Sequence, residues 1–142
     1  MKVNDPGNAY REIQIKTANQ IRLIVMLYDG AIKRINLALD LFAEGHRRYD
    51  AINNHVIGAQ DILSELTASL DFEKGGVLAR NLFSLYSFMN RRLLEGNLKK
   101  DPAPLREVRK LLGELREAWD EISTRKGLEE NPTPATGVNI AG

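Results

Sequence analysis

The chain has 142 residues, of which 43% are hydrophobic, and its 20 basic and 19 acidic side chains leave a formal net charge of +1. This length favours one domain, and the balanced charge creates no long-range field that would attract nucleic acid or an anionic membrane. Because the chain contains no cysteine, a disulfide framework and a thiolate metal site are excluded.

The N-terminal third is predicted to consist of an arm and one long helix. Residues 1–16 are polar and contain Pro6, so we expect an N-terminal arm or cap there. Apolar periodicity predicts a helix over about 19–44, with Asn19 as its N-cap and Gly45 as its stop.

Three more helices are predicted from apolar side chains that recur at spacings of three and four. They cover about 50–71, 76–99 and 103–125, with turns at Gly75-Gly76 and at Pro102. The expected core positions are Ile52, Val56, Ala59, Leu63, Leu66 and Leu70; Leu78, Leu82, Leu85, Met89 and Leu93; and Leu105, Val108, Leu112, Leu115, Trp119 and Ile122.

Four helices with short connections predict an all-α, antiparallel up-down-up-down four-helix bundle. No segment alternates with a period of two for long enough to predict a strand. Residues 127–142 lack the apolar content needed to fold, so we expect a flexible, disordered C-terminal tail after a single domain at 1–126.

The first helix carries more apolar surface than a bundle needs. Wound at about 100° per residue, it has one face suited to the core and a second apolar face nearly opposite. The first face holds Ile21, Ile24, Tyr28, Ile32, Ile35, Leu39 and Phe42, and the second holds Leu23, Met26, Gly30, Leu37 and Leu41. The arm, a second copy of the chain or an amphipathic helix of another polypeptide could cover the second face.

Smaller excesses occur at Ile57, Phe83, Phe88 and Leu94, outside the expected core positions. Leaving such side chains in water is unfavourable, at roughly 25 cal/mol per Å². We therefore expect a surface that binds another polypeptide. The candidate client-binding residues are Leu23, Met26, Leu37, Leu41 and Ile57.

Gly30 follows Asp29 in the middle of the first helix. A glycine there costs about 1 kcal/mol relative to alanine, so a helix that approaches the backbone closely is expected to compensate. That helix could belong to a client, but ordinary packing within the bundle is the favoured interpretation.

No residue pattern predicts catalysis, a cofactor or a metal site. His46 is expected in a loop beside two arginines, and His55 at the core edge of the second helix. The Glu-x-x-His pairs of a di-iron bundle and the phosphate-binding P-loop motif are both absent from the sequence. A phosphotransfer bundle that uses His55 remains an alternative from another functional class.

Membrane and secretion signals are also missing from the sequence. No basic stretch followed by an apolar run opens the chain, and its longest apolar run is far shorter than the ~20 residues of a spanning helix. We expect a cytoplasmic protein with no membrane insertion and no nucleic-acid partner. A self-associating structural bundle is a further alternative, and we expect a monomer or a weak homodimer.

Several motifs resemble those of one known family. They are Asn8-Ala9-Tyr10-Arg11, Met26-Leu27-Tyr28-Asp29-Gly30-Ala31, Gly75-Gly76, Leu85-Tyr86, Arg91-Arg92-Leu93 and Leu115-Arg116-Glu117-Ala118-Trp119. With these motifs, residues 8–120 resemble the FliS family of flagellar export chaperones, which bind flagellin before secretion.

The resemblance implies a non-enzymatic chaperone with a four-helix bundle and an N-terminal segment packed on one end. It implies that the disordered C-terminal segment of flagellin lies along apolar grooves as helices and is thereby kept from polymerising. It also implies delivery of flagellin to the type III export gate, whose cytoplasmic domain is contacted through the N-terminal region, here at Tyr10.

Overall fold

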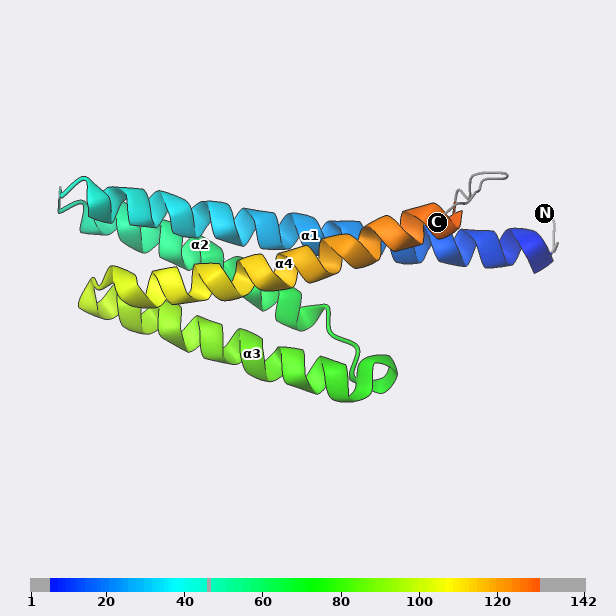
Figure 1. Cartoon of the computed structure of the whole chain (residues 1–142). Coiled ribbons are helices and arrows are strands. Elements are labelled where there is room, and N and C mark those ends of the chain that lie inside the picture. Colours follow the sequence, from blue (N-terminus) through cyan, green and yellow to red (C-terminus); the bar gives the residue numbers. More distant parts are fainter. Residues whose placement is uncertain (1–5, 46, 131–142) are drawn as a thin grey trace. The chain divides into compact units, whose positions relative to one another are not determined.

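The structure, a computed structural model, describes residues 6–45 and 47–130, and side chains within 19–45 and 47–125. Four helices follow one another: α1 (Pro6–Ala43), α2 (Tyr49–Ala68), α3 (Phe72–Lys99) and α4 (Pro102–Glu130) (Figure 1). The described residues contain no strand. The predicted all-α fold is therefore confirmed.

The helix bounds differ from the sequence prediction at both ends of the chain. Residues 6–16 were expected to be an arm, but they are helical and belong to α1. At the other end, α4 continues to Glu130 and so includes the first residues of the predicted tail. Residues 131–142, the rest of that tail, lie outside the described part of the chain.

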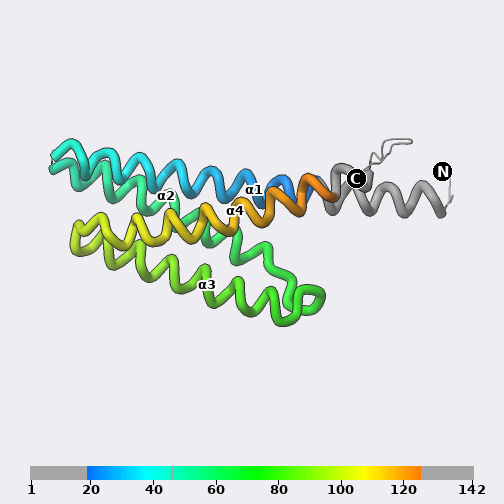
Figure 2. The backbone as a smooth tube through the Cα atoms, viewed as in Figure 1, coloured from blue at the N-terminus to red at the C-terminus, as the bar shows by residue number. Residues whose placement is uncertain are grey.

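The chain divides into two compact units, which we describe separately. The larger unit is Met26–Arg116, and the smaller unit combines Met1–Val25 with Glu117–Gly142. In the larger unit, short connections make each helix run antiparallel to the one before it (Figure 2). The up-down-up-down arrangement is therefore confirmed for this unit.

The core of the larger unit follows the predicted stripes. Apolar side chains from all four helices are less than a tenth exposed, and many are fully buried. They are Tyr28, Ala31, Ile35, Ala38, Leu39, Ile52, Val56, Ala59, Leu63, Leu66, Ala79, Leu82, Tyr86, Met89, Leu93, Leu105, Val108 and Leu112. In the smaller unit, Ile21, Val25 and Ser123 are buried.

The start of α3 corrects two predictions. The helix begins at Phe72, because the Asp71 side chain caps it by accepting hydrogen bonds from the backbone N–H groups of Glu73 and Lys74, both at 3.0 Å. Gly76 then adopts φ 52° and ψ −125°, so the helix has a kink where a turn was expected. Leu78, a predicted core residue, is 59% exposed, because Ala79 is the residue that faces the core after this kink.

Gly30 is explained by packing inside the chain. A Cβ atom on Gly30 would lie 3.3 Å from Cδ1 of Ile62, so a side chain of α2 packs closely over Gly30 at this point. This contact supports the interpretation that the glycine serves ordinary helix packing.

Polar side chains connect the outer edges of the helices. Arg92 of α3 pairs with Glu107 of α4 at 2.5 Å, and Arg116 of α4 pairs with Asp29 of α1 at 2.8 Å. Hydrogen bonds from Lys99 and from Arg92 lower the pKa of the Glu95 carboxyl. All of these groups are partly exposed, so each pair adds little to the stability of the fold.

Candidate client-binding surface

The predicted α1 candidates are largely exposed. In the smaller unit, Leu23 is 58% exposed. In the larger unit, Met26 is 60% and Leu37 is 37% exposed, whereas Leu41 is half-buried. These apolar side chains face water in the isolated chain.

Contacts in the larger unit show on which side of α1 two of the candidates lie. The Arg34 guanidinium faces α2, where Nη1 lies 3.2 Å from Nδ1 of His55 and Nε lies 2.8 Å from the position of a Cβ atom on Gly58. Leu37 and Leu41 follow Arg34 by one and two helical turns and so share its side of the helix. They therefore lie along the edge where α1 packs against α2.

Ile57, which is 44% exposed, lies on the other side of α2. The next residue on its face, Gln60, donates from Nε2 to the backbone oxygen of Asn90 in α3 at 3.4 Å. One turn earlier, Asn53 Oδ1 accepts from Nδ2 of Asn97 at 2.8 Å. The structure therefore places Leu37 and Leu41 beside the α1–α2 edge and Ile57 beside the α2–α3 edge.

A hollow of about 310 Å³ lies between α2 and α3. We name it the α2–α3 hollow, and its lining residues are Gln60, Ser87, Asn90, Arg91 and Leu94. This volume is at the lower end of the range of about 300–1,000 Å³ that is typical of binding pockets.

Asn90, which lines this hollow, has a side-chain oxygen that no described residue satisfies. Its side-chain oxygen is buried, and among the described residues it has no hydrogen-bond partner. A buried polar atom without a partner is unfavourable, so this oxygen is a local cost to the fold beside the hollow.

Exposed apolar side chains continue the surface of α3 on both sides of the hollow. Leu94 is 46%, Phe83 is 45% and Leu98 is 74% exposed. Phe83 lies one turn before Ser87, and Leu98 lies one turn after Leu94, so they share one face of α3. Phe83 also contacts Phe72 edge to face, with ring centroids 5.9 Å apart. The arrangement gives an apolar strip with a polar centre, which suits an amphipathic helix.

The α2–α3 hollow was only partly predictable from the sequence. Phe83 and Leu94 were recognised as excess apolar residues, and the structure leaves both exposed. The polar lining residues Gln60, Ser87 and Asn90 were missed, because periodicity assigns a residue to a face but cannot show a space between two helices.

Other chemistries find little support at this surface. His55 is half-buried beside the Arg34 guanidinium, and His46 lies outside the described residues. No cluster of three or more potential metal ligands occurs among the residues that the structure describes. None of the four described helices is long and apolar enough to cross a membrane.

Comparison with known proteins identifies the family. Residues 3–126 match the family model described as flagellar protein FliS. The chain belongs to the FliS family. It is 38% identical over 133 residues to the flagellar secretion chaperone FliS of Salmonella typhimurium, an alignment that covers 87% of this chain and 93% of that protein.

Two further FliS relatives agree with this assignment. The flagellar secretion chaperone FliSB of Pseudomonas aeruginosa is 39% identical over 113 residues, with 79% of this chain and 87% of the relative covered. FliS of Bacillus subtilis is 31% identical over 121 residues, with 85% and 88% covered. Membership of this family supports a chaperone role in flagellar export.

Proposed function

We propose that this FliS-family chain binds the disordered C-terminal segment of flagellin in the cytoplasm, prevents its premature polymerisation and assists its delivery to the flagellar type III export gate. The observation that carries the proposal is the exposed apolar surface of α1, α2 and α3. Its best-defined part is the α2–α3 hollow, with Ile57, Phe83 and Leu94 around it.

Burial of this surface provides the driving force for binding. Apolar area removed from water contributes roughly 25 cal/mol per Å² to binding. The conformational entropy that a disordered client loses on becoming ordered offsets part of this free energy. The client gains backbone hydrogen bonds by folding into helices on the chaperone. A segment covered in this way cannot pair with another flagellin subunit.

The α1 residues Leu23, Met26, Leu37 and Leu41 and the α2 residue Ile57 remain the proposed client contacts. Because Leu37 and Ile57 lie on opposite edges of α2, one short helix would not contact both. An extended client with at least two contact segments could contact both the α1–α2 edge at Leu37 and the α2–α3 edge at Ile57.

Tyr10 is the proposed contact for the export gate. Its side chain lies outside the described part of the structure, and the proposal rests on its place in the Asn8-Ala9-Tyr10-Arg11 motif. We expect Tyr10→Ala to weaken binding to the cytoplasmic domain of the export-gate protein and to leave flagellin binding unchanged. Loss of both interactions would contradict a separate gate contact.

Gel filtration with light scattering tests the chaperone function. Purified chain mixed with a flagellin C-terminal segment should elute as a one-to-one complex, and circular dichroism should show more helix than the sum of the two components. A concentration-independent dimer of the chain that the segment does not alter would instead support the self-associating structural bundle.

A further inference from the structure

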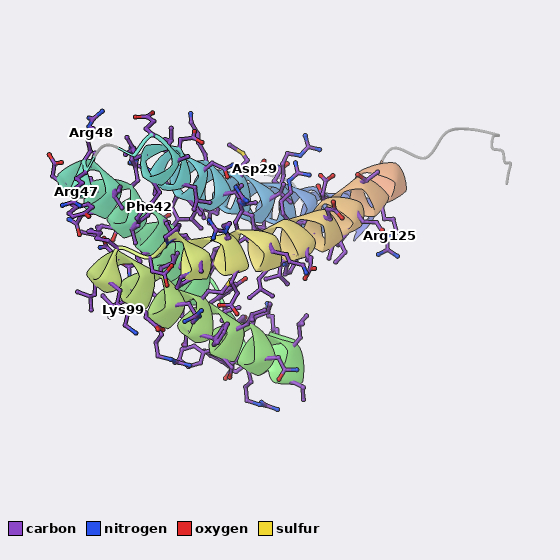
Figure 3. All side chains as sticks on the ribbon, turned by 60° about the vertical axis from the view of Figure 1, so that its left-hand side comes forward. Asp29, Phe42, Arg47, Arg48, Lys99 and Arg125 are labelled. Carbon is purple, nitrogen blue, oxygen red and sulfur yellow. The ribbon has the colours of Figure 1, made fainter. Side chains whose placement is uncertain are left out.

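A second hollow lies at the end of the larger unit, where α1 leads into α2 and α3 leads into α4. It has a volume of about 210 Å³, and we name it the end pocket. Figure 3 labels Phe42, Arg47 and Arg48 near this end of the bundle. The pocket is lined by Phe42, Gly45, Arg47, Tyr49, Ile52 and Lys100.

The lining combines apolar walls with two cations. Phe42, Tyr49 and Ile52 supply apolar and aromatic surface, and Arg47 and Lys100 supply positive charge. None of the described residues that line the pocket carries a carboxylate. Among the side chains that the structure describes, no ion pair is formed by Arg47 or Lys100.

The Lys100 ammonium is held in place by neutral groups. It donates a hydrogen bond to Oδ1 of Asn97, and Nζ lies 3.5 Å from the backbone oxygen of Tyr49 and 5.7 Å from the centre of the Tyr49 ring. Burial lowers the pKa of Lys100, since these contacts do not replace all of its hydration. A negatively charged partner would offset that loss.

The backbone of Lys100 is also unusual. Lys100 has φ 52° and is the only non-glycine residue with positive φ among the described residues. It lies just after the last residue of α3, where the left-handed conformation favours glycine. A lysine in this conformation is therefore strained, and strain of this kind is often found at binding sites.

The size and lining of the end pocket define its ligand. A volume of 210 Å³ is below that of a typical small-molecule site, so it suits a single residue of a polypeptide. One residue presents both an apolar side chain and a carboxylate only when it is the last residue of its chain. We propose that the end pocket binds the apolar C-terminal residue of a partner polypeptide, with its side chain against Phe42 and Ile52 and its carboxylate between Arg47 and Lys100.

This inference goes beyond the proposed function and does not depend on it, because the partner is defined only by its terminal chemistry. The probe is a short acetylated peptide of glycines ending in leucine, prepared as the free acid and as the C-terminal amide. Amide NMR spectra of the full chain should show saturable shifts near Lys100 with the acid, and binding at least about tenfold weaker with the amide. Equal binding of the two peptides would overturn the inference.

A third peptide distinguishes the source of the carboxylate. It carries glutamate as its penultimate residue and ends in leucine amide, so its carboxylate is not terminal. It should bind at least about tenfold more weakly than the free acid. Binding as strong as that of the free acid would overturn the assignment to a chain terminus.

Two adjacent lysines provide matched variants. Lys100→Gly should weaken binding of the acid by about tenfold or more, because a charge-assisted contact is lost, while the unfolding temperature stays the same or rises. Lys99→Ala removes the same charge from a side chain that pairs with Glu95 at 3.1 Å and does not line the pocket, so binding should not change. Equally weakened binding of the free acid in both variants, or unchanged binding in Lys100→Gly, would overturn the proposal.

Discussion

The hydroxyl groups of Tyr28 and Tyr86 lie 2.5 Å apart and form a hydrogen bond across the core of the larger unit. The two rings are tilted by 55°, with centroids 6.4 Å apart, and the residues are 0% and 2% exposed. The pair joins α1 to α3, although the two tyrosines are 58 positions apart in the sequence. It fixes how these two helices pack, because buried hydroxyl groups require partners.

Removing one hydroxyl from this pair should destabilise the fold. Tyr28→Phe keeps the ring but deprives the Tyr86 hydroxyl of its partner, so we expect the free energy of unfolding to fall by about 1–2 kcal/mol. Urea unfolding of both single variants and of the double variant measures the coupling, expected at about 0.5 kcal/mol or more. Additive effects of the two substitutions would contradict a direct interaction.

Stability should fall at alkaline pH, partly because of Tyr86. Burial raises the pKa of Tyr86 above its ordinary value of 10.0, although the hydrogen bond with Tyr28 opposes this shift. As pH rises, the folded state therefore retains the Tyr86 proton while the unfolded chain releases it. The contribution of Tyr86 to the free energy of unfolding is complete below pH 10.0 and is lost as pH rises toward the higher folded pKa. Between pH 8 and 11.5, the free energy of unfolding should decline less steeply in Tyr86→Phe than in the wild-type chain. Parallel curves would refute this origin of the pH dependence.

Gly96 should not tolerate a methyl group. A Cβ atom there would lie 2.6 Å from Cδ1 of Leu105 and 2.9 Å from the backbone oxygen of Asp101. We expect Gly96→Ala to lower the free energy of unfolding by about 1–3 kcal/mol through overpacking. Gly113 is the control, because nothing lies within 4 Å of its Cβ position, and Gly113→Ala should stabilise α4 by up to about 1 kcal/mol.

Leu93 and Leu94 are sequence neighbours with opposite environments, at 0% and 46% exposed. Leu93→Ala creates a cavity in the core and should cost about 2–5 kcal/mol of unfolding free energy. Leu94→Ala should change it by no more than about 0.5 kcal/mol. A large stability loss in Leu94→Ala would show that this side chain serves the fold and is not available to a client.

The sequence predicted the core better than the helix ends. Ile52, Val56 and Leu63 were expected in the core, and all are buried, because their spacing on α2 leaves one face for the bundle. Leu78 was wrongly placed in the core, since helical periodicity alone cannot show a kink at Gly76 that brings Ala79 inward. The cap formed by Asp71 was missed for a similar reason, because the glycine pair that follows it indicated a later start for α3.

The sequence predicted that apolar side chains of α1 are exposed, but it did not predict which helix edges they lie on. Leu23, Met26 and Leu37 are exposed, as the excess apolar surface of the first helix suggested. That Leu37 and Ile57 lie on different edges of α2 depends on which helices are neighbours in space. The end pocket was not predicted, because it brings Lys100 beside Tyr49, 51 residues away in the sequence.

The most direct test of the central claim is calorimetric titration of a flagellin C-terminal segment into the wild-type chain and into an Ile57→Asp, Leu94→Asp variant. Both positions are exposed, at 44% and 46%, so the variant should unfold at nearly the wild-type temperature. The account predicts one-to-one binding by the wild type, with a negative heat-capacity change from apolar burial, and at least about tenfold weaker binding by the variant. Undiminished binding by the folded variant, or no binding by the wild type, would contradict the claim that this exposed apolar surface holds the client.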